Sequence, residues 1–427
     1  MISNEQLKQV LVEQYDSILS KDTGVKREAL SEISSKINLP HIHVITGLRR
    51  CGKSTFLRQI MNEYYNDTGF YYINFEDERL YNYPASEFNV IYELLIQLFG
   101  KNKVFFIDEI QNVNNFENFI RRFYDDGIKF FISGSNASLL SSEIATKLTG
   151  RHIDTRLTPF SFTEFLTFSN IKYSGKDFYK SEKKAEIINA FNIYLKNGGM
   201  PEYIKYNDKE ILTRTYNDIV LKDIVVRYKL ENILQLKMLY SYIVNNYARR
   251  YSYNSLRKIV NLGSSNTIIN YLNYLEQTFF IKQLVKFDYS IKKQIANEKK
   301  SYIVDNGFIT SLSVVLTKDE GWLLENLVFN ELIKSNDAVY YYSDKNECDF
   351  LTINNAKPDQ AIQVTSAINQ SNLDREINGL LEAMNKLNIN YGIVLSKETE
   401  KTVKINKNEL SIIPIWKWLL QKKQKTI

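Results

Sequence analysis

Eight consecutive residues, GLRRCGKS at 47–54, have the types and spacing that binding of a nucleoside triphosphate requires. The run fits the pattern G-x-x-x-x-G-K-[ST] in full, with apolar sequence before it and helical sequence after it. Its glycines let backbone N–H groups turn toward phosphates, and the N-terminus of the following helix adds partial positive charge. The sequence therefore predicts a loop that binds ATP or ADP together with Mg²⁺.

Two side chains of this loop have individual roles. Lys53 is expected to reach the β- and γ-phosphates, and the hydroxyl of Ser54 is expected to hold Mg²⁺. The residues predicted to bind the nucleotide are Gly47, Leu48, Arg49, Arg50, Cys51, Gly52, Lys53, Ser54, Thr55 and Asp108.

A second apolar run, VFFIDE at 104–109, ends in two acids. Four apolar residues are typical of a buried strand, so Asp108 is expected to emerge at its carboxyl end beside the loop, as the second residue for Mg²⁺. Glu109 is then placed to polarise the attacking water. The alternative is a strand that simply ends in exposed acids, and the neighbouring loop argues against it.

The run KFFIS at 129–133 leads to Ser135 and Asn136. A polar side chain at the end of the strand beside the acidic one can hydrogen-bond the γ-phosphate or the attacking water. The same residues also suit the N-cap of a following helix, and both interpretations can hold together.

Hydrolysis also needs a cation to neutralise the charge that spreads over the γ-phosphate. Arg151 is the stronger candidate, because Gly150 before it lets the backbone present the side chain, and Arg156 is the other candidate. The alternative for Arg151 is a surface salt bridge. Phosphate chemistry alone does not tell whether such an arginine acts in its own subunit or on a neighbour.

The elements that must position these residues alternate strand with helix between residues 41 and 136. Each strand is almost entirely apolar, which is typical of a parallel sheet covered by helices on both faces. The fold class is therefore α/β, with a P-loop parallel-sheet core at 41–160 and a helical arm at 1–40. Residues 161–235 are predicted to form several helices, and strands return after about residue 295.

Length, composition and charge limit the class of protein. The 427 residues predict two or three domains, and no apolar stretch approaches the roughly 18 residues of a membrane span. The two cysteines, Cys51 and Cys348, are far apart in sequence, which indicates a reducing, cytoplasmic setting.

The net charge is +6, and residues 236–290 carry seven Lys or Arg against two acids. This local excess favours a polyanion partner, although a solvated basic face would give the same count.

The basic segment has the pattern of a helix-turn-helix with a wing. A helix is predicted from Ser252, a turn at Gly263, a second helix over 266–276 and a basic strand over 279–287. The second helix exposes asparagines and carries no arginine for contact with guanine. A DNA-binding role through residues 236–290 and a role in contacting a protein partner both stay open.

Residues of the C-terminal part approach the pattern of a metal-dependent nuclease without completing it. The template is a helix Glu, a strand Asp, and Glu/Gln-x-Lys on the next strand. Its places are taken here by Glu325, Asp349, Gln363 and Thr365. Because an amide and a hydroxyl replace the second acid and the lysine, the sequence predicts a degenerate site that holds Mg²⁺ weakly and does not cut DNA.

Longer signatures carry a resemblance to a known family. Besides the nucleotide motifs, the chain contains, in this order, PFSFTEFL (159–166), NGGMPEY (197–203) and LENLVFNEL (324–332). It thereby resembles a prokaryotic family of AAA+-type ATPases that pair an AAA domain of the AAA_14 type with a C-terminal DUF4143 region. The resemblance implies a core with an additional strand, followed by a helical lid (161–235), a winged helix (236–294) and a restriction-endonuclease-like domain (295–427). It also implies a homo-oligomer in which Arg151 acts on the ATP of a neighbour.

Three functions compete on these observations. The first is an ATP-hydrolysing assembly or switch that acts on DNA or protein, and Glu109 and Arg151 favour it. The second is a slow, nucleotide-gated binding module that uses its C-terminal domain for docking, which the Gln363 and Thr365 pair favours. The third is an ATP-gated nuclease, against which the missing lysine counts.

Overall fold

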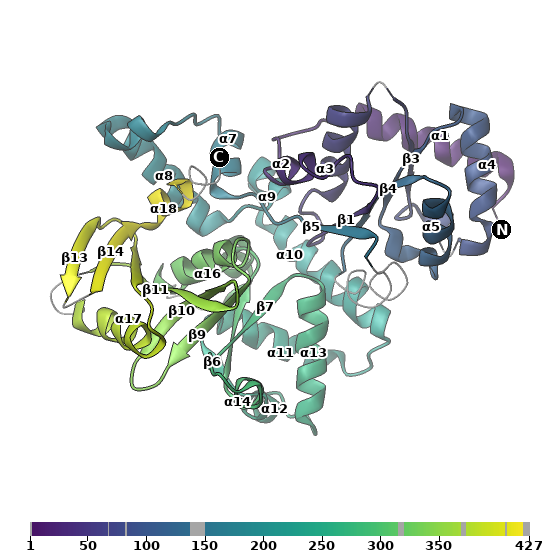
Figure 1. The fold of residues 1–427 in the computed structure, drawn as a ribbon. Helices are drawn as coiled ribbons and strands as arrows, with labels where there is room; N and C mark the ends of the chain where they lie inside the picture. Colours follow the sequence, from purple (N-terminus) through teal and green to yellow (C-terminus); the bar gives the residue numbers. More distant parts are fainter. Residues whose placement is uncertain are drawn as a thin grey trace. The chain divides into compact units, whose positions relative to one another are not determined.

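The computed structural model describes residues 2–66, 68–81, 83–136, 150–314, 320–368, 373–405 and 408–421 (Figure 1). The chain forms two compact units. The N-terminal unit comprises Met1–Pro159 with Gln277–Phe279, and the C-terminal unit comprises Phe160–Glu276 with Phe280–Ile427.

A five-stranded parallel sheet forms the centre of the N-terminal unit. Its strands are β1 (Ile42–Thr46), β2 (Tyr71–Asn74), β3 (Val104–Asp108), β4 (Lys129–Gly134) and β5 (His152–Arg156). They lie in the order β2-β3-β4-β1-β5, so β4 is inserted between the strand before the phosphate loop and the strand that ends in acids. This confirms the predicted parallel-sheet core with an additional strand. The polar edge strand β5 was not predicted, because HIDTR lacks the apolar run that marks a buried strand.

Helices surround this sheet. They are α1 (Asn4–Ser20), α2 (Ala29–Ser34), α3 (Lys53–Ile60), α4 (Phe88–Phe99) and α5 (Phe116–Asp125), with shorter turns η1 (Met61–Tyr65), η2 (Glu78–Leu80), η3 (Ala85–Glu87) and η4 (Ile110–Asn112). Helix α1 begins at a capping box, in which Ser3 Oγ accepts from the Gln6 amide at 3.2 Å. Its apolar face, with Leu7, Val10 and Leu11, is buried in the same core as the sheet. Helix α1, within the predicted N-terminal arm, thus packs into the core of this unit.

The segment that follows the core is helical, as the sequence predicts. Its elements are α7 (Phe162–Phe168), η6 (Gly175–Tyr179), α8 (Ser181–Asn197), α9 (Pro201–Tyr206), α10 (Lys209–Asp218) and the π-helix η7 (Ile219–Val226). Among the described residues, no helix combines the length and the apolar character needed to cross a lipid bilayer.

The signatures PFSFTEFL and NGGMPEY contact each other. The Phe160 amide donates to the carbonyl of Gly199 at 2.7 Å, and Tyr194 Oη donates to the Phe160 carbonyl at 2.7 Å. A Cβ on Gly199 would lie 2.2 Å from that same carbonyl oxygen, so only glycine fits. Ser161 caps α7 by accepting from the Glu164 amide at 3.2 Å. Both signatures therefore have structural roles.

A small three-stranded sheet follows, with helices before and between its strands. The elements are α11 (Ile233–Asn245), β6 (Arg250–Tyr251), α12 (Tyr253–Ile259), α13 (Ser265–Gln277), β7 (Ile281–Val285), α14 (Ile291–Ala296) and β8 (Lys299–Ile303). The strands lie in the order β6-β8-β7 and both pairings are antiparallel. Strand β8 lies beyond residue 294, where the sequence analysis placed the start of the last domain, yet it completes this small sheet.

The last part of the chain contains a six-stranded mixed sheet in the order β13-β14-β12-β11-β10-β9. The elements are α15 (Asn306–Leu312), α16 (Glu320–Leu332), β9 (Ala338–Ser343), β10 (Glu347–Asn354), β11 (Lys357–Thr365), α17 (Leu373–Leu387), β12 (Tyr391–Ser396), β13 (Lys401–Ile405), β14 (Asn408–Pro414) and α18 (Ile415–Gln421). Asn326 of α16 is fully buried and joins the helix to the small sheet, since its amide both accepts from and donates to the backbone of Ile303 at 2.8 Å.

Candidate nucleotide-binding and hydrolysis site

The phosphate loop runs from the end of β1 to the start of α3, in the context that the sequence predicts. A Cβ on Gly47 would lie 2.2 Å from the carbonyl oxygen of Leu157, so no residue with a side chain fits at this position. Gly52 has φ 99°, in the left-handed region that glycine adopts without strain, and α3 begins after it. These two glycines therefore fix the path of the loop.

A buried arginine that the sequence analysis did not identify supports the loop. Arg27, from the segment between α1 and α2, donates through Nη1 to the carbonyl of Cys51 at 3.0 Å. Its Nη2 donates to the carbonyl of Thr158 at 2.5 Å, and its backbone amide donates to Gln59 Oε1 of α3 at 3.1 Å. The planar guanidinium thus joins the loop to the segment after β5.

Lys53 faces Glu109 across the site. Their charged groups are 3.3 Å apart, and the two side chains are 4% and 13% exposed. Lys53 Nζ also lies 3.4 Å from the carbonyl oxygens of Gly47 and Leu48. Burial would raise the pKa of Glu109, but the Lys53 ammonium and a hydrogen bond from Gln111 outweigh it and lower that pKa. Glu109 is therefore a carboxylate at neutral pH, as a general base must be.

Asp108 is fully buried beside the loop and accepts hydrogen bonds from the hydroxyls of Ser133 and Ser54. Burial and the neighbouring Glu109 charge raise its pKa, while the two hydroxyls oppose that rise. The structure therefore brings together the two residues expected to hold Mg²⁺. A hydroxyl and a carboxylate suit this cation, which takes hard oxygen ligands and is bound by few protein groups.

A polar network extends from Glu109 to the end of β4. The Glu109 amide donates to Ser133 Oγ at 3.2 Å, and Gln111 Nε2 donates both to the Glu109 carboxylate and to Ser135 Oγ at 3.2 Å. Glu109 itself has φ 52°, a left-handed conformation that is costly for a residue with a side chain. Asn136 is fully buried, and the helix expected after it lies outside the described residues. Ser133 and Gln111 are partners that the sequence analysis missed.

The two candidate arginines lie at opposite ends of β5. Arg151 precedes the strand, and its carbonyl accepts from the amide of Ile42 at 2.9 Å, at the start of β1. Its guanidinium pairs with Asp125 Oδ1 at 2.8 Å and lies over the ring of Tyr124. Arg156, in contrast, is in register with Thr46, the last residue of β1 before the loop.

The sequence matches three family models in succession. An AAA domain, AAA_14, covers residues 40–166, and DUF4143, a domain of unknown function, covers 320–418. A further domain of unknown function, DUF8612, covers 188–319. This chain belongs to the family that joins an AAA_14 domain to DUF4143. The site above therefore lies in the AAA domain, which is of the P-loop ATPase type.

Two relatives match this chain over nearly its whole length, and several solved structures match parts of it. An uncharacterized protein of Methanocaldococcus jannaschii is 38% identical over 91% of this chain and 90% of its own length. An uncharacterized protein of Haemophilus influenzae is 28% identical over 94% of this chain and its whole length. Among solved structures, domain III of the Thermotoga maritima replication initiation protein DnaA matches with 14% identity over 47% of this chain and 90% of that one, at a TM-score of 0.29. The Thermotoga maritima RuvB Holliday junction branch migration motor matches with 18% identity over 66% and 89%, at a TM-score of 0.27.

A second cluster of buried charges occupies the C-terminal unit, around Glu325 of α16. Lys300 Nζ lies 2.9 Å from Glu325 Oε1 and 2.7 Å from Glu347 Oε1, and the Lys300 side chain is 4% exposed. Tyr302 Oη donates to the same Glu325 oxygen at 2.6 Å. Lys300 comes from β8, outside the DUF4143 match, so no local pattern pointed to it. A buried lysine therefore accompanies these acids, although it is not at the position of Thr365.

Asp349 and Gln363 meet on neighbouring strands of the DUF4143 sheet. Asp349 Oδ2 accepts from the Val364 amide at 2.9 Å, and the Asp349 amide donates to Gln363 Oε1 at 3.2 Å. Burial, followed by the Glu325 charge, raises the pKa of Asp349 to about 8. Gln363 Nε2 donates to Glu376 Oε2 of α17 at 3.2 Å, which adds an acid that the sequence pattern did not indicate.

Thr365, the fourth residue of the predicted degenerate site, bonds to nearby backbone. Its Oγ1 donates to the carbonyl of Ala367 at 3.0 Å. Within the described ranges, no group of three or more His, Cys, Asp or Glu side chains is arranged to hold a metal ion. Glu325, Asp349 and Gln363 are thus held by ion pairs and hydrogen bonds to the protein itself.

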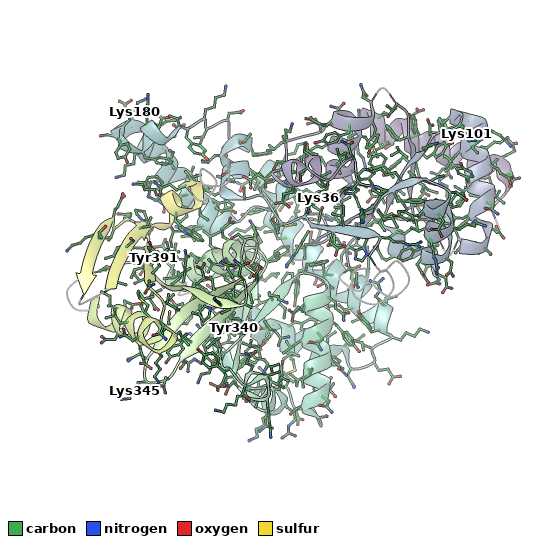
Figure 2. The ribbon with its side chains drawn as sticks, in the orientation of Figure 1. Lys36, Lys101, Lys180, Tyr340, Lys345 and Tyr391 are labelled. Carbon is green, nitrogen blue, oxygen red and sulfur yellow. The ribbon has the colours of Figure 1, made fainter. Side chains whose placement is uncertain are left out.

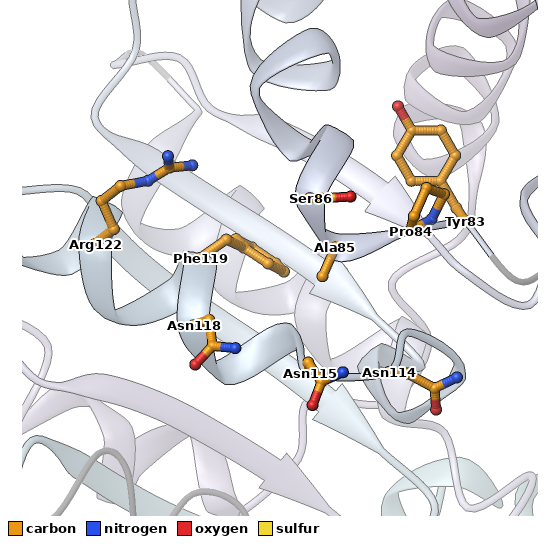
Figure 3. A pocket seen from close by; sticks show the side chains of 9 residues that line it. All are labelled: Tyr83, Pro84, Ala85, Ser86, Asn114, Asn115, Asn118, Phe119 and Arg122. Atoms are coloured by element: carbon orange, nitrogen blue, oxygen red, sulfur yellow. The ribbon is translucent and has the colours of Figure 1, made fainter.

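The AAA domain also has an open pocket of about 610 Å³ away from the phosphate loop (Figure 3). Pro84 and Ala85, before α4, form one side, and the amides of Asn114, Asn115 and Asn118 form the other. None of the residues predicted to bind the nucleotide lines it. The pocket is thus distinct from the candidate nucleotide site.

Proposed function

We propose that the N-terminal unit is an Mg²⁺-dependent ATPase. The observation that carries the proposal is that Lys53, at the start of α3, meets Asp108 and Glu109 at the carboxyl end of β3, with the two acids in different protonation environments. Lys53 and the loop amides would bind the β- and γ-phosphates. Ser54 and Asp108 would hold Mg²⁺, which supplies positive charge to the phosphate oxygens.

In this proposal Glu109 accepts the proton of the attacking water while the oxygen of that water bonds to the γ-phosphorus. The bond to ADP breaks, and ADP leaves with the electron pair. The lowered pKa of Glu109 keeps the carboxylate ready to accept this proton. Gln111 is a positioning residue, because it hydrogen-bonds the Glu109 carboxylate and Ser135 at once.

A steady-state phosphate-release assay with the full chain tests the proposal. Glu109→Gln keeps the shape of the side chain and removes the base, so it should bind ATP and hydrolyse it at least a hundredfold more slowly. Glu93→Gln, an exposed substitution on α4, is the matched control and should keep the wild-type rate. Wild-type turnover in Glu109→Gln would mean that the base is elsewhere. A wild-type protein that binds ATP but releases no phosphate would favour the alternative, a slow nucleotide-gated docking module.

We further propose that the active form is a homo-oligomer in which Arg151 stabilises the γ-phosphate charge of a neighbour. Arg151 lies beside the start of β1, and the phosphate loop begins after the end of β1. The strand has five residues, so the two are separated by roughly 16 Å. An arginine side chain does not span that distance, which supports action on another copy. The Asp125 ion pair is more than a third exposed on both sides and holds Arg151 only weakly.

Mixing two inactive variants tests this arrangement. Lys53→Ala removes the nucleotide site and Arg151→Ala removes the arginine, so each alone should hydrolyse ATP slowly. If the arginine acts on a neighbour, a mixture should recover activity, because some interfaces pair an intact site with an intact arginine. Activity per subunit should also rise with concentration. A mixture no more active than its components, together with a monomer at all concentrations, would contradict the proposal.

A further inference from the structure

The segment from α11 to β8 has the element order of a winged helix. Helix α11 and strand β6 precede the helix pair α12 and α13, and β7 and β8 follow with residues 286–298 between them. The central position of β8 between β6 and β7 closes the small sheet. In this arrangement α13 takes the place of the recognition helix and residues 286–298 take the place of the wing.

Helix α13 has one buried face and one polar face. Ile268, Leu272 and Leu275 are fully buried. On the other side, the exposed residues Asn266, Asn270 and Asn273 follow one another at intervals of four and three, which aligns them along one face of a helix. A row of amides without an intervening charge is suited to read the edges of bases, because asparagine pairs with N6 and N7 of adenine in the major groove.

The wing combines exposed lysines with exposed apolar side chains. Lys292 and Lys293 are exposed on α14, and Lys293 lies 3.9 Å from the acid Asp288. Ile291 and Ile295, on the same short helix, are 72% and 68% exposed. Proteins that bend DNA insert such apolar residues between base steps, with cations beside them on the phosphates.

Contacts hold the wing strands against both helices of the pair. Tyr253 of α12 donates to Gln283 Oε1 of β7 at 3.1 Å, and Gln283 Nε2 donates to Glu276 Oε2 of α13 at 2.9 Å. Lys299, at the end of the wing, lies over the ring of Tyr253. The amide face and the basic wing therefore belong to one packed structure and keep a fixed relation to each other.

The charge of the chain is concentrated in this segment. Between residues 249 and 299 there are nine Lys or Arg and three Asp or Glu, an excess of six that equals the net charge of the whole chain. Arg250 and Lys282 are paired with Glu347 and Glu276. The other exposed cations are Arg249, Lys258, Lys292 and Lys293, while Arg257 and Lys286 are half-buried.

We infer that this surface, Asn266, Asn270 and Asn273 of α13 with the lysines of the wing, binds double-stranded DNA and favours A·T base pairs. DNA would be the partner on which the proposed ATPase acts. The inference rests on the proposed function only where it links DNA binding to ATP hydrolysis. Duplex RNA fits less well, because its deep, narrow major groove does not admit a helix. A membrane surface fits less well too, since the apolar face of α14 is one short helix of six residues.

Fluorescence anisotropy with a labelled 30-base-pair duplex and the full chain, without nucleotide, tests the inference. Lys292→Ala combined with Lys293→Ala should weaken binding about tenfold and lower the slope of log affinity against log salt by about 2. Asn270→Ala should reduce the preference for an A·T-rich over a G·C-rich duplex about tenfold. The charge-matched control is Lys101→Ala with Lys103→Ala, two exposed lysines of the N-terminal unit, and it should bind as wild type. Lys101 is labelled in Figure 2.

Other results would overturn the inference. Equal loss in the control pair would mean that DNA responds only to total charge. Equal affinity for duplex RNA, or tighter binding to polyglutamate or to anionic lipid vesicles, would assign the surface to another partner. Because the DNA-binding assay contains no nucleotide, its result does not depend on whether the protein hydrolyses ATP. A protein that binds DNA as expected but releases no phosphate contradicts only the ATPase, and one that hydrolyses ATP but binds no DNA contradicts only this inference.

Discussion

The ammonium of Lys53 lies 3.3 Å from the carboxylate of Glu109. The residue expected to bind the phosphates thus forms an ion pair with the residue expected to activate water. Each side chain is almost fully buried, and the pair satisfies two charges that would be costly alone. The Glu109 charge raises the pKa of Lys53 against the effect of burial, and the Lys53 charge lowers that of Glu109. In the proposed function, a triphosphate that draws Lys53 toward its oxygens would remove part of this partner from Glu109 and make the carboxylate more basic.

Lys53→Ala should reduce ATP affinity at least tenfold, which corresponds to about 1.4 kcal/mol, while the fold persists. The substitution removes the charge that meets the phosphates. It also leaves burial to act on Glu109 unopposed by the ammonium, so the pKa of Glu109 should rise. Isothermal titration with ATP and Mg²⁺ measures the affinity, and Lys101→Ala is the control for the loss of one lysine. Affinity within twofold of wild type would contradict the assignment of the loop.

Arg27→Ala should weaken nucleotide binding although Arg27 is not itself one of the residues predicted to bind the nucleotide. The side chain bonds two carbonyls, those of Cys51 and Thr158, and buried acceptors left without a donor cost about 1–3 kcal/mol in stability. Arg27→Lys keeps the charge but cannot reach both carbonyls in one plane, so it should recover only part of the loss. The measurements are ATP affinity and thermal midpoint. A lowered midpoint with unchanged affinity would limit Arg27 to a role in folding.

Asp305 should make the C-terminal unit less stable as pH rises from about 4 to about 6. Its carboxylate accepts from the Gly199 amide at 2.6 Å and from the Gly307 amide at 2.9 Å. Burial nevertheless raises its pKa from 3.8 to about 6. The folded state thus keeps a proton that the unfolded state releases, and about 3 kcal/mol of stability present below pH 4 is lost above pH 6.

Thermal midpoints of wild type and Asp305→Asn across pH 4 to 7 measure this effect. The asparagine variant has one acceptor fewer and should be less stable at low pH. It cannot titrate, so the difference between the two proteins should shrink as pH rises. A constant difference across this range would contradict the raised pKa of Asp305.

The DUF4143 region should not cleave DNA. The ammonium of Lys300 is already neutralised by Glu325 and Glu347, and it is too buried to reach a phosphodiester. Incubation with plasmid, linear and single-stranded DNA and Mg²⁺ or Mn²⁺ should therefore leave all three intact. Cleavage that disappears in Asp349→Ala would contradict this prediction and assign the region a nuclease function.

The arrangement of the candidate nucleotide site could be predicted from the sequence because its signals are local. The loop, the strand before it and the helix after it are consecutive, and Asp108 and Glu109 directly follow four apolar residues. Burial of a parallel strand requires that apolar run, and the carboxyl ends of such strands meet at one edge of the sheet. Local sequence therefore determined the type of core and the position of the acids.

Residues that reach a site from elsewhere in the chain gave no such signal. Arg27 supports the loop from the segment before β1, and Ser133 reaches Asp108 from the neighbouring strand. Lys300 joins Glu325 from a strand of the small sheet, so the cluster could not be deduced from a template that spans a helix and two strands. Only the tertiary structure brings such side chains together, because long-range contacts depend on strand order and packing.

The position of Arg151 was likewise decided by the tertiary structure. The sequence indicates an arginine after a glycine, which suits a phosphate ligand or a surface ion pair equally well. Parallel pairing of β1 with β5 sets Arg151 beside the start of β1 and Arg156 beside its end. Because β5 runs parallel to β1, the residue before β5 lies beside the start of β1. Arg151 is therefore separated from the phosphate loop of its own chain by the length of β1.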